Sequence, residues 1–246
     1  MRIPFPCLEC DRDAGAPRQR VWAYGEISDT GIHSVSCPNG HDSQYRLVFE
    51  APHELLLDVG ALALLDGYLR ECVSGFAAAL EQSFEFFVEA NLSARGVPAE
   101  EVRRLLSTNR RDQRRAGMIS LCYLQETGRA FPFLQSKRAE FRNKVIHNAS
   151  WPSREEVVDF ARYVCDALKD LDAALGNKRA GLLQRMDDAA NLEAAEITLA
   201  YGVAPTSIVR PNFYSMVRHE TTFEDALARF GKEGWWKWPT RLHSAG

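Results

Sequence analysis

The spacing of hydrophobic residues changes near residue 57. Up to that point, short segments alternate hydrophobic and polar positions, a period of two that is typical of half-buried strands. These segments predict strands at 20–24, 32–36 and 44–49. Beyond it, hydrophobic residues recur every three to four positions, which is the period of an amphipathic helix. The chain is therefore predicted to be mainly α, with a small β module at its N-terminus.

Helices are predicted for most of the chain after residue 57. Hydrophobic residues from Leu62 to Phe87 form one continuous stripe, which predicts a single helix of about thirty residues. Shorter helices are predicted after Pro98, at about 114–127 and at about 131–148. The last of these is expected to end before Trp151-Pro152, because the residue before a proline avoids helical geometry.

A further helix has clear ends in the sequence. Ser153 and Glu156 have the spacing of a capping box, and Gly176 follows the last hydrophobic position. Between these ends, hydrophobic residues are spaced alternately by four and by three, as in a coiled-coil seam. The predicted architecture is therefore an up-and-down bundle of helices packed at shallow angles.

The C-terminal quarter has weaker patterns. Helices are predicted at about 179–196 and after Thr221, which has the capping-box spacing with Glu224. The aromatic tail at 234–239 is expected to pack on the bundle, with a platform for stacking bases as the alternative. The predicted division is a β module at 1–52, a helical bundle at 53–176 and a C-terminal extension at 177–246.

Composition limits the classes of function. The chain has 246 residues, is 46% hydrophobic and carries a formal net charge of -3, which excludes a generally basic nucleic-acid binder. Its longest apolar runs are broken by Asp58 and Asp66, well short of the ~18 residues that span a bilayer. The N-terminus has Pro4, Pro6 and Cys7 where a signal peptide has its apolar core. A cytoplasmic protein that does not contact a membrane is expected.

Two closely spaced pairs of potential metal ligands lie in the N-terminal module. Cys7 and Cys10 form the first pair, and Cys37 and His41 form the second, with Gly40 giving its turn conformational freedom. Turns of this length let both members of a pair reach one metal ion. The pattern resembles a zinc ribbon with one cysteine replaced by histidine. Because four protein ligands leave no open position, the expected Zn²⁺ is structural.

His33 is an alternative fourth ligand. Its spacing from Cys37 runs along a predicted strand rather than a turn, so His41 is preferred. Disulfides are disfavoured because the expected compartment is reducing.

The segment Arg142-Asn143-Lys144-Val145-Ile146-His147 lies on the helix predicted at 131–148. Its arginine, asparagine and histidine are side-chain types that can cut RNA without a metal, since histidine transfers protons near neutral pH and arginine holds phosphate. Asn143 and His147 are four apart and share a helix face. One helix supplies one residue of each type, so a two-fold dimer is expected to complete the site.

Basic residues gather before and within this segment. Four of them are predicted to contact RNA: Arg114, Arg115, Arg138 and Lys144. The alternative is a solvated helix face, because carboxylates lie close by in the sequence. In the same way, an arginine and a histidine on one helix are often only surface and helix-ending residues.

The helical hairpin, the helix with Arg142 and His147, and the hydrophobic helix after it resemble the HEPN superfamily, over about residues 57–175. The resemblance implies a metal-independent endoribonuclease that acts as a homodimer in toxin–antitoxin pairs, phage defence or stress response. It assigns His147 as acid and base, Arg142 as phosphate clamp and Asn143 as a polar positioning residue. It also implies an acidic residue from an earlier helix, here Glu81 or Glu85, and an antitoxin or regulatory protein as a partner.

The expected reaction leaves 2',3'-cyclic phosphate ends on the RNA. No phosphate loop, serine-hydrolase motif or H-E-x-x-H motif is present in the sequence, which argues against kinases, serine hydrolases and metal-dependent nucleases. The competing hypothesis is a non-catalytic HEPN-like dimer that binds RNA or a partner protein through its ribbon and bundle. A DNA-binding regulator is less favoured, because no recognition helix follows the ribbon.

Overall fold

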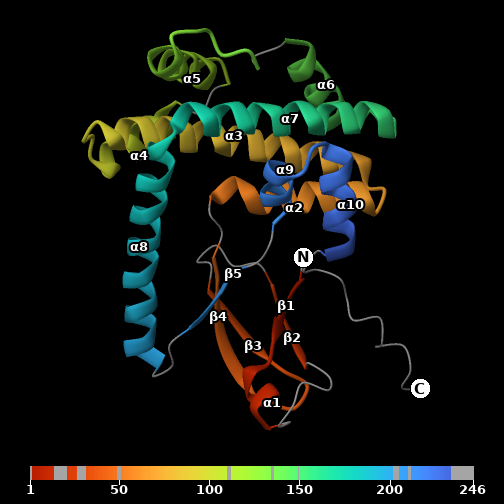
Figure 1. Cartoon of the computed structure of the whole chain (residues 1–246), viewed down its shortest axis with the longest axis vertical. Helices are drawn as coiled ribbons and strands as arrows, with labels where there is room; N and C mark the ends of the chain where they lie inside the picture. The colour runs from red at the N-terminus through yellow and green to blue at the C-terminus, as the bar shows by residue number, and fades with distance from the viewer. Residues whose placement is uncertain are drawn as a thin grey trace. The chain divides into compact units, whose positions relative to one another are not determined.

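The computed structural model of the protein describes residues 2–13, 21–26, 32–48, 51–109, 112–133, 136–148, 150–201, 205–209 and 212–233. As predicted, this part of the chain is mainly α-helical with a small β module (Figure 1). It divides into two compact units. The first comprises the described residues of Met1–Phe49, Asp187–Pro211 and Glu233–Gly246, and the second those of Glu50–Met186 and Asn212–Lys232.

The first unit contains two small sheets. Their strands are β1 (Arg2–Pro6), β2 (Trp22–Glu26), β3 (Ile32–Ser36), β4 (Asp42–Val48) and β5 (Thr206–Val209). β1 pairs with β2 and β3 pairs with β4, both antiparallel, whereas β5 lies parallel to β4. The strand predicted at 32–36 matches β3, and those predicted at 20–24 and 44–49 are shifted by about two residues. The sequence did not predict β1, because Pro4 and Pro6 interrupt it.

Aromatic side chains form the core of the β module. The rings of Phe5 and Tyr45 stack with their centroids 4.9 Å apart, and both side chains are fully buried. Along β3, Val35 and His33 are buried while Ser34 and Ser36 are exposed, which is the alternation that predicted the strand. A short helix that the sequence did not predict, α1 (Leu8–Asp13), follows β1. The core therefore supports the turn on which Cys10 lies.

The second unit is built around two long helices, α3 (Leu69–Ala94) and α7 (Arg154–Leu175), which run side by side in Figure 1. Helices α5 (Asp112–Thr127) and α6 (Ser136–His147) pack against α3 along one edge of this pair. On the other edge lie α2 (Pro52–Leu65), α9 (Phe213–His219) and α10 (Phe223–Glu233). The short α4 (Ala99–Thr108) follows α3.

The prediction of a single helix from Leu62 to Phe87 is wrong, because the segment forms parts of two helices. α2 ends at Leu65 and α3 begins at Leu69, with Gly67 in the turn at a φ of +82°. Residues other than glycine rarely adopt this left-handed conformation. The hydrophobic stripe nevertheless continues across the turn, because α2 folds back on α3 and both helices bury the same face.

The ends of α7 are confirmed. The backbone amide of Glu156 donates to Ser153 Oγ at 3.2 Å, and the amide of Ser153 donates to Glu156 Oε2 at 2.8 Å. Gly176 follows the last turn. α6 begins at Ser136 rather than near Phe131, which instead lies in the turn before it with its side chain buried in the core.

The predicted extension 177–246 does not behave as one segment. α8 (Asn177–Tyr201) begins in the second unit and continues into the first, where Arg46 donates hydrogen bonds to Asp187 and Asn191 at 2.5 and 2.6 Å. β5 joins the β module, whereas α9 and most of α10 belong to the bundle. The aromatic tail predicted at 234–239 lies outside the described residues. α10 is capped by Thr222 rather than by Thr221, since Thr222 Oγ1 accepts from the amide of Asp225.

Two carboxylates of α2 hold α9 in place. Asn212, which caps α9, donates to Glu54 at 2.6 Å, and the amide of Phe213 donates to Asp58 at the same distance. Both carboxylates are buried, so these bonds satisfy groups that would otherwise be costly to bury. Among the described residues, no helix is both long enough and apolar enough to cross a membrane.

Candidate functional site

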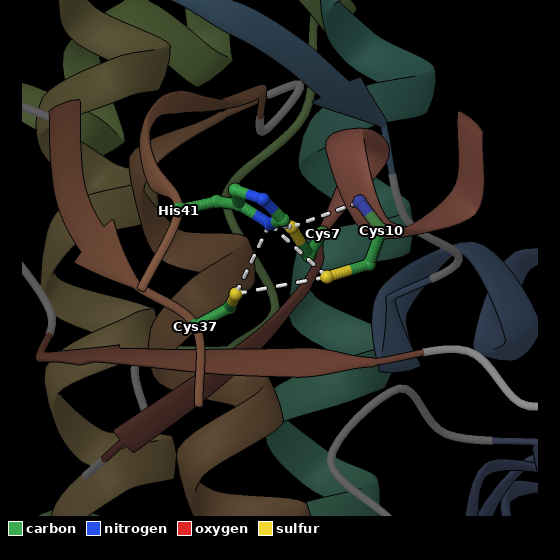
Figure 2. A group of neighbouring side chains, drawn as sticks. All are labelled: Cys7, Cys10, Cys37 and His41. Atoms are coloured by element: carbon green, nitrogen blue, oxygen red, sulfur yellow. Dashed lines mark hydrogen bonds between the residues drawn. The ribbon is translucent and has the colours of Figure 1, made fainter. Parts of the chain in front are cut away.

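Three cysteines and one histidine of the β module converge on one point (Figure 2). Cys7 lies between β1 and α1, and Cys10 lies in α1. Cys37 follows β3 and His41 precedes β4. The turn that carries the second pair is closed by bonds from the amide of Gly40 to the Cys37 carbonyl at 2.9 Å and from the amide of Cys37 to the His41 carbonyl at 3.0 Å. Gly40 has a φ of +85°, as expected from its place in the turn.

The ligand atoms have the spacing of a tetrahedral metal site. Zinc–sulfur bonds of about 2.3 Å and zinc–nitrogen bonds of about 2.0 Å at tetrahedral angles put sulfurs about 3.8 Å apart and sulfur about 3.5 Å from nitrogen. Cys10 Sγ and Cys37 Sγ are 3.8 Å apart. His41 Nδ1 lies 3.6, 3.2 and 3.6 Å from the sulfurs of Cys7, Cys10 and Cys37. All four ligand atoms lie within 4.8 Å of one another.

Groups around the ligands orient them. Asn39 Nδ2 donates to Cys10 Sγ at 3.2 Å, and the amide of Cys10 points to Cys7 Sγ at 3.5 Å. The second ring nitrogen of His41, Nε2, lies 3.9 Å from a carboxylate oxygen of Glu9. A histidine that binds metal through one nitrogen commonly turns its other nitrogen to a carboxylate, which fixes the ring. Glu9 and Asn39 were not predicted, although both lie within the two ligand turns.

Without a metal ion, the surrounding protein groups do not favour ionisation of all three cysteine thiols in this cluster. Burial raises the pKa of the Cys10 thiol to about 11, with Asn39 opposing the shift. Burial acts in the same direction on Cys37, but hydrogen bonds from the amides of His41 and Asn39 prevail and lower its pKa to about 7. Three buried thiolates would therefore need a cation.

The cluster is suited to a metal rather than to a disulfide. The 3.8 Å between the sulfurs of Cys10 and Cys37 is far longer than a disulfide bond of about 2.05 Å, and the described cysteines are free. The competing ligand His33 is engaged elsewhere, because its Nδ1 donates to the Glu26 carbonyl at 2.7 Å. This buried cluster could therefore bind a metal such as zinc through the four ligands predicted from the sequence.

A second group of predicted site residues lies on α6, in the helical unit. Arg142 is largely buried, with 19% of its side chain exposed, and forms a direct ion pair with Glu81 of α3. Its other terminal nitrogen donates to Asn143 Oδ1 at 3.0 Å. Burial lowers the pKa of Arg142, although a guanidinium remains charged at any physiological pH. The arginine is thus held in one orientation from two sides.

The carboxylate that holds Arg142 is shared with a second arginine. Arg115 of α5 lies 3.6 Å from the other oxygen of Glu81 and 2.7 Å from Glu85. The two acidic residues considered from the sequence, Glu81 and Glu85, therefore both lie in this network. Glu81 is the one that pairs directly with Arg142 in the contacts described above.

His147 is exposed at the last residue of α6, and Asn143 is exposed one turn before it. Val145 is buried between them, and its carbonyl accepts a hydrogen bond from Arg70 of α3 at 3.2 Å. α6 is therefore anchored on α3 while His147 faces solvent. Arg142 differs from His147, because its side chain is turned toward α3 and pairs with Glu81.

No family model, curated protein or solved structure matches this chain.

The four predicted RNA contacts fall into two pairs. Arg114 and Lys144 are exposed. Arg115 is bound by Glu85, and Arg138 forms an ion pair with Asp159 and lies 5.3 Å from the centre of the Tyr163 ring. The hydrogen bond from Arg138 also lowers the pKa of Asp159. Only part of the predicted basic surface is therefore directed to solvent.

Proposed function

We propose that the protein is a metal-independent endoribonuclease of the HEPN type that acts as a homodimer, with a zinc-stabilised β module. The observation that carries the proposal is the Arg142–Glu81 pair. A phosphate clamp must have a fixed orientation before the substrate arrives, and this arginine is held by Glu81 and Asn143 on a helix that also carries His147.

In the proposed reaction the RNA attacks itself. A base removes the proton of a 2'-hydroxyl, the 2'-oxygen attacks the adjacent phosphorus, and the bond from phosphorus to the 5'-oxygen breaks. An acid protonates the departing 5'-oxygen. The products are a 2',3'-cyclic phosphate and a 5'-hydroxyl, so no water or metal is consumed. His147 supplies the proton transfer, and Arg142 stabilises the negative charge of the phosphorane.

The reaction needs both an acid and a base, whereas each chain offers one His147. A two-fold pairing of α6 helices would bring together two histidines and two arginines. Exposed apolar residues on the neighbouring α5 support an interface in this region, since Leu121 and Leu124 are 57% and 50% exposed. Light scattering coupled to size-exclusion chromatography should give the mass of two chains.

We assign the ion of the β module as structural Zn²⁺. The spacing of the ligand atoms fits four-coordinate zinc, and a site with four protein ligands has no position left for a substrate. The buried free thiols fit a reducing compartment, so we place the protein in the cytoplasm. A toxin–antitoxin pair or an antiviral or stress response is the setting that best suits an RNA-cutting enzyme of this type.

The decisive experiment is incubation of the purified protein with RNA in EDTA. Cleavage should persist, and the products should carry 2',3'-cyclic phosphate ends. Arg142→Ala and His147→Ala should each lower the rate by about a hundredfold or more. Matched controls are Arg162→Ala, which breaks another arginine–glutamate pair between helices, and His219→Ala, which removes another exposed histidine at a helix end. Full activity in either test variant contradicts the assignment.

A non-catalytic module that binds RNA or a partner protein is the second candidate. The ion pairs of Arg115, Arg138 and Arg142 favour it, because they neutralise charges that an enzyme would offer to phosphate. A dimer that binds RNA or a protein partner and leaves every RNA intact would support this reading.

A further inference from the structure

Three glutamates form a ridge along α3. Glu81, Glu85 and Glu89 follow one another at intervals of four residues, so they lie on one face of the helix and span about 12 Å of its length. Glu81 pairs with Arg142 and Glu85 pairs with Arg115. Glu89 differs from both, because it makes no hydrogen bond or close ion pair with any other described residue. The ridge thus ends in a carboxylate that forms no close ion pair with the residues that the structure describes.

Glu89 lines a pocket of about 410 Å³ that lies within the helical unit. Phe86, Leu106 and Met186 provide apolar walls from α3, α4 and α8. Arg103 of α4 faces the same pocket. Gln82 and Ser107 add further polar groups, so the lining is mixed and suits a flat ligand that both packs against apolar side chains and forms hydrogen bonds, as a single base does.

The charges around the pocket balance. Arg103 and Arg115 are matched by Glu85 and Glu89, and all four residues line the pocket. Burial raises the pKa of Glu89, with Arg103 and Arg185 opposing the shift. A balanced pocket does not select a free phosphate. It suits a flat, uncharged group that offers hydrogen-bond donors to Glu89 and acceptors to Arg103.

We infer that this pocket binds one guanine base of the RNA substrate, close to the phosphate held by Arg142. Guanine is the standard base whose Watson–Crick edge presents two adjacent donors, N1–H and N2–H, which match the two oxygens of one carboxylate. Its O6 and N7 accept from an arginine. Adenine and cytosine place an acceptor beside their amino group, which a carboxylate repels. The inference rests on the proposed function for the identity of the ligand as RNA.

The pocket is connected to Arg142 by contacts. Arg115 lines the pocket and also lies 3.6 Å from Glu81, whose other oxygen binds Arg142. The pocket and the clamp are therefore separated by a single carboxylate. A bound guanine would belong to a nucleotide near the cut, so it would determine where the RNA is cleaved.

The first test measures binding and does not require cleavage. The full chain is titrated with guanosine, adenosine, cytidine and uridine 5'-monophosphates in a calorimeter. The guanine nucleotide should bind about tenfold more tightly than the others or better. Glu89→Gln should abolish this preference, and Glu71→Gln, which changes an exposed glutamate at the start of α3, should retain it. Equal binding of all four nucleotides, or an unchanged preference in Glu89→Gln, overturns the inference.

The second test maps cleavage sites in a mixed RNA. Wild type should cut at a fixed distance from guanine, and the cuts made by Glu89→Gln should no longer follow guanine. Selective binding without cleavage would support the pocket and contradict the proposed nuclease. Cleavage without any preference for guanine, together with unselective binding, would support the nuclease and contradict the pocket.

Discussion

At the scale of single residues, Glu81 is the main support of the candidate site. Its two oxygens bind Arg142 of α6 and Arg115 of α5, so one carboxylate orients two helices at once. In the proposed nuclease, a side chain in this place would act through the arginine rather than on RNA. Removing its charge should leave Arg142 present but less precisely oriented.

We expect Glu81→Gln to lower the rate of RNA cleavage by roughly ten- to hundredfold, less than the loss in Arg142→Ala, because a shift of about 1 Å in a catalytic group costs this much. Initial rates on one defined RNA, with a separate KM measurement, check it. Glu101→Gln is the control, since Glu101 pairs with Arg104 on the exposed side of α4. An unchanged rate in Glu81→Gln would show that Arg142 needs no such support.

His53 is a second residue whose environment has a measurable effect. Only 2% of its surface is exposed, and its ring packs edge-on against Phe86 and Tyr214 at 5.6 and 5.8 Å. Burial, and next the charge of Arg179, lower its pKa to about 3. In the unfolded chain its pKa is about 6.5. Between about pH 3 and pH 6.5, His53 is therefore mostly neutral in the folded protein and mostly protonated in the unfolded chain.

This difference predicts a loss of stability in acid. At about pH 8 and above, His53 is neutral in both states, so it contributes no pH dependence. As the pH falls below about 6.5, the unfolded chain gains a proton, and His53 lowers the free energy of unfolding by about 1.4 kcal/mol per pH unit until about pH 3. Urea unfolding at several pH values gives the free energy of unfolding as a function of pH. Between about pH 6.5 and pH 3 this free energy should fall less steeply for His53→Phe than for the wild type. His219→Phe, an exposed control, should keep the slope of the wild type.

At the scale of elements, the closest helix contact is that between α2 and α3. A Cβ added to Gly75 would lie 2.9 Å from both the Cα and the backbone nitrogen of Gly60. Backbone atoms cannot move aside as a flexible side chain can, so the two helices would have to separate. Gly117 on α5 offers the contrast, because a Cβ there would meet nothing within 4 Å.

We expect Gly75→Ala to lower the free energy of unfolding by roughly 1–3 kcal/mol, the usual cost of overpacking. Gly117→Ala should raise it by about 0.5–1 kcal/mol, because alanine favours the helix over glycine. Urea unfolding measures both. Equal and small effects would mean that α2 and α3 are less closely packed than described.

The sequence predicted a helix end correctly where residues next to that end determine it. The capping box at Ser153 and the glycine at 176 are of this kind, and both ends of α7 were found. The turn at Gly67 was missed because the hydrophobic period continues across it. β5 was missed because its partner is β4, far away in the sequence.

In the candidate site, too, the features set by neighbouring residues could be predicted and those that depend on distant segments could not. The convergence of the three cysteines and His41 could be predicted, because each pair lies within one short turn. The choice between Glu81 and Glu85 as the partner of Arg142 could not, since it depends on how α6 is rotated against α3. The pocket at Glu89 has no sequence signal, because α3, α4 and α8 contribute to it from separate segments.

At the scale of the whole molecule, the cysteine–histidine cluster links segments of the β module, whose hydrophobic core is small. Cys7 and Cys10 come from the β1–α1 segment, whereas Cys37 and His41 come from the β3–β4 turn. Binding of a metal there is expected to supply folding free energy, because the unfolded chain has no such site. The helical unit has its own extensive hydrophobic core.

Removal of the metal should therefore act on one unit. We expect about one zinc ion per chain in the wild type, and close to none in Cys10→Ser. Hydrogen exchange should show lost protection in β3 and β4 of this variant, with α3 and α7 still protected. Cys122→Ser, which changes a buried cysteine of the helical core, should retain the metal. Zinc retained at wild-type level in Cys10→Ser would contradict the assignment.

The parallel pairing of β4 with β5 has a consequence for how the protein is made. Tyr45 pairs with Thr206, so about 160 residues, including most of the helical unit, are synthesised between the two partner strands. Most of the helical unit can form from contacts that are closer in sequence, but the β4–β5 pair cannot form until β5 has left the ribosome. On a ribosome, β4 would therefore remain an open strand edge during most of translation, and its pairing with β5 would follow the synthesis of α2 to α8.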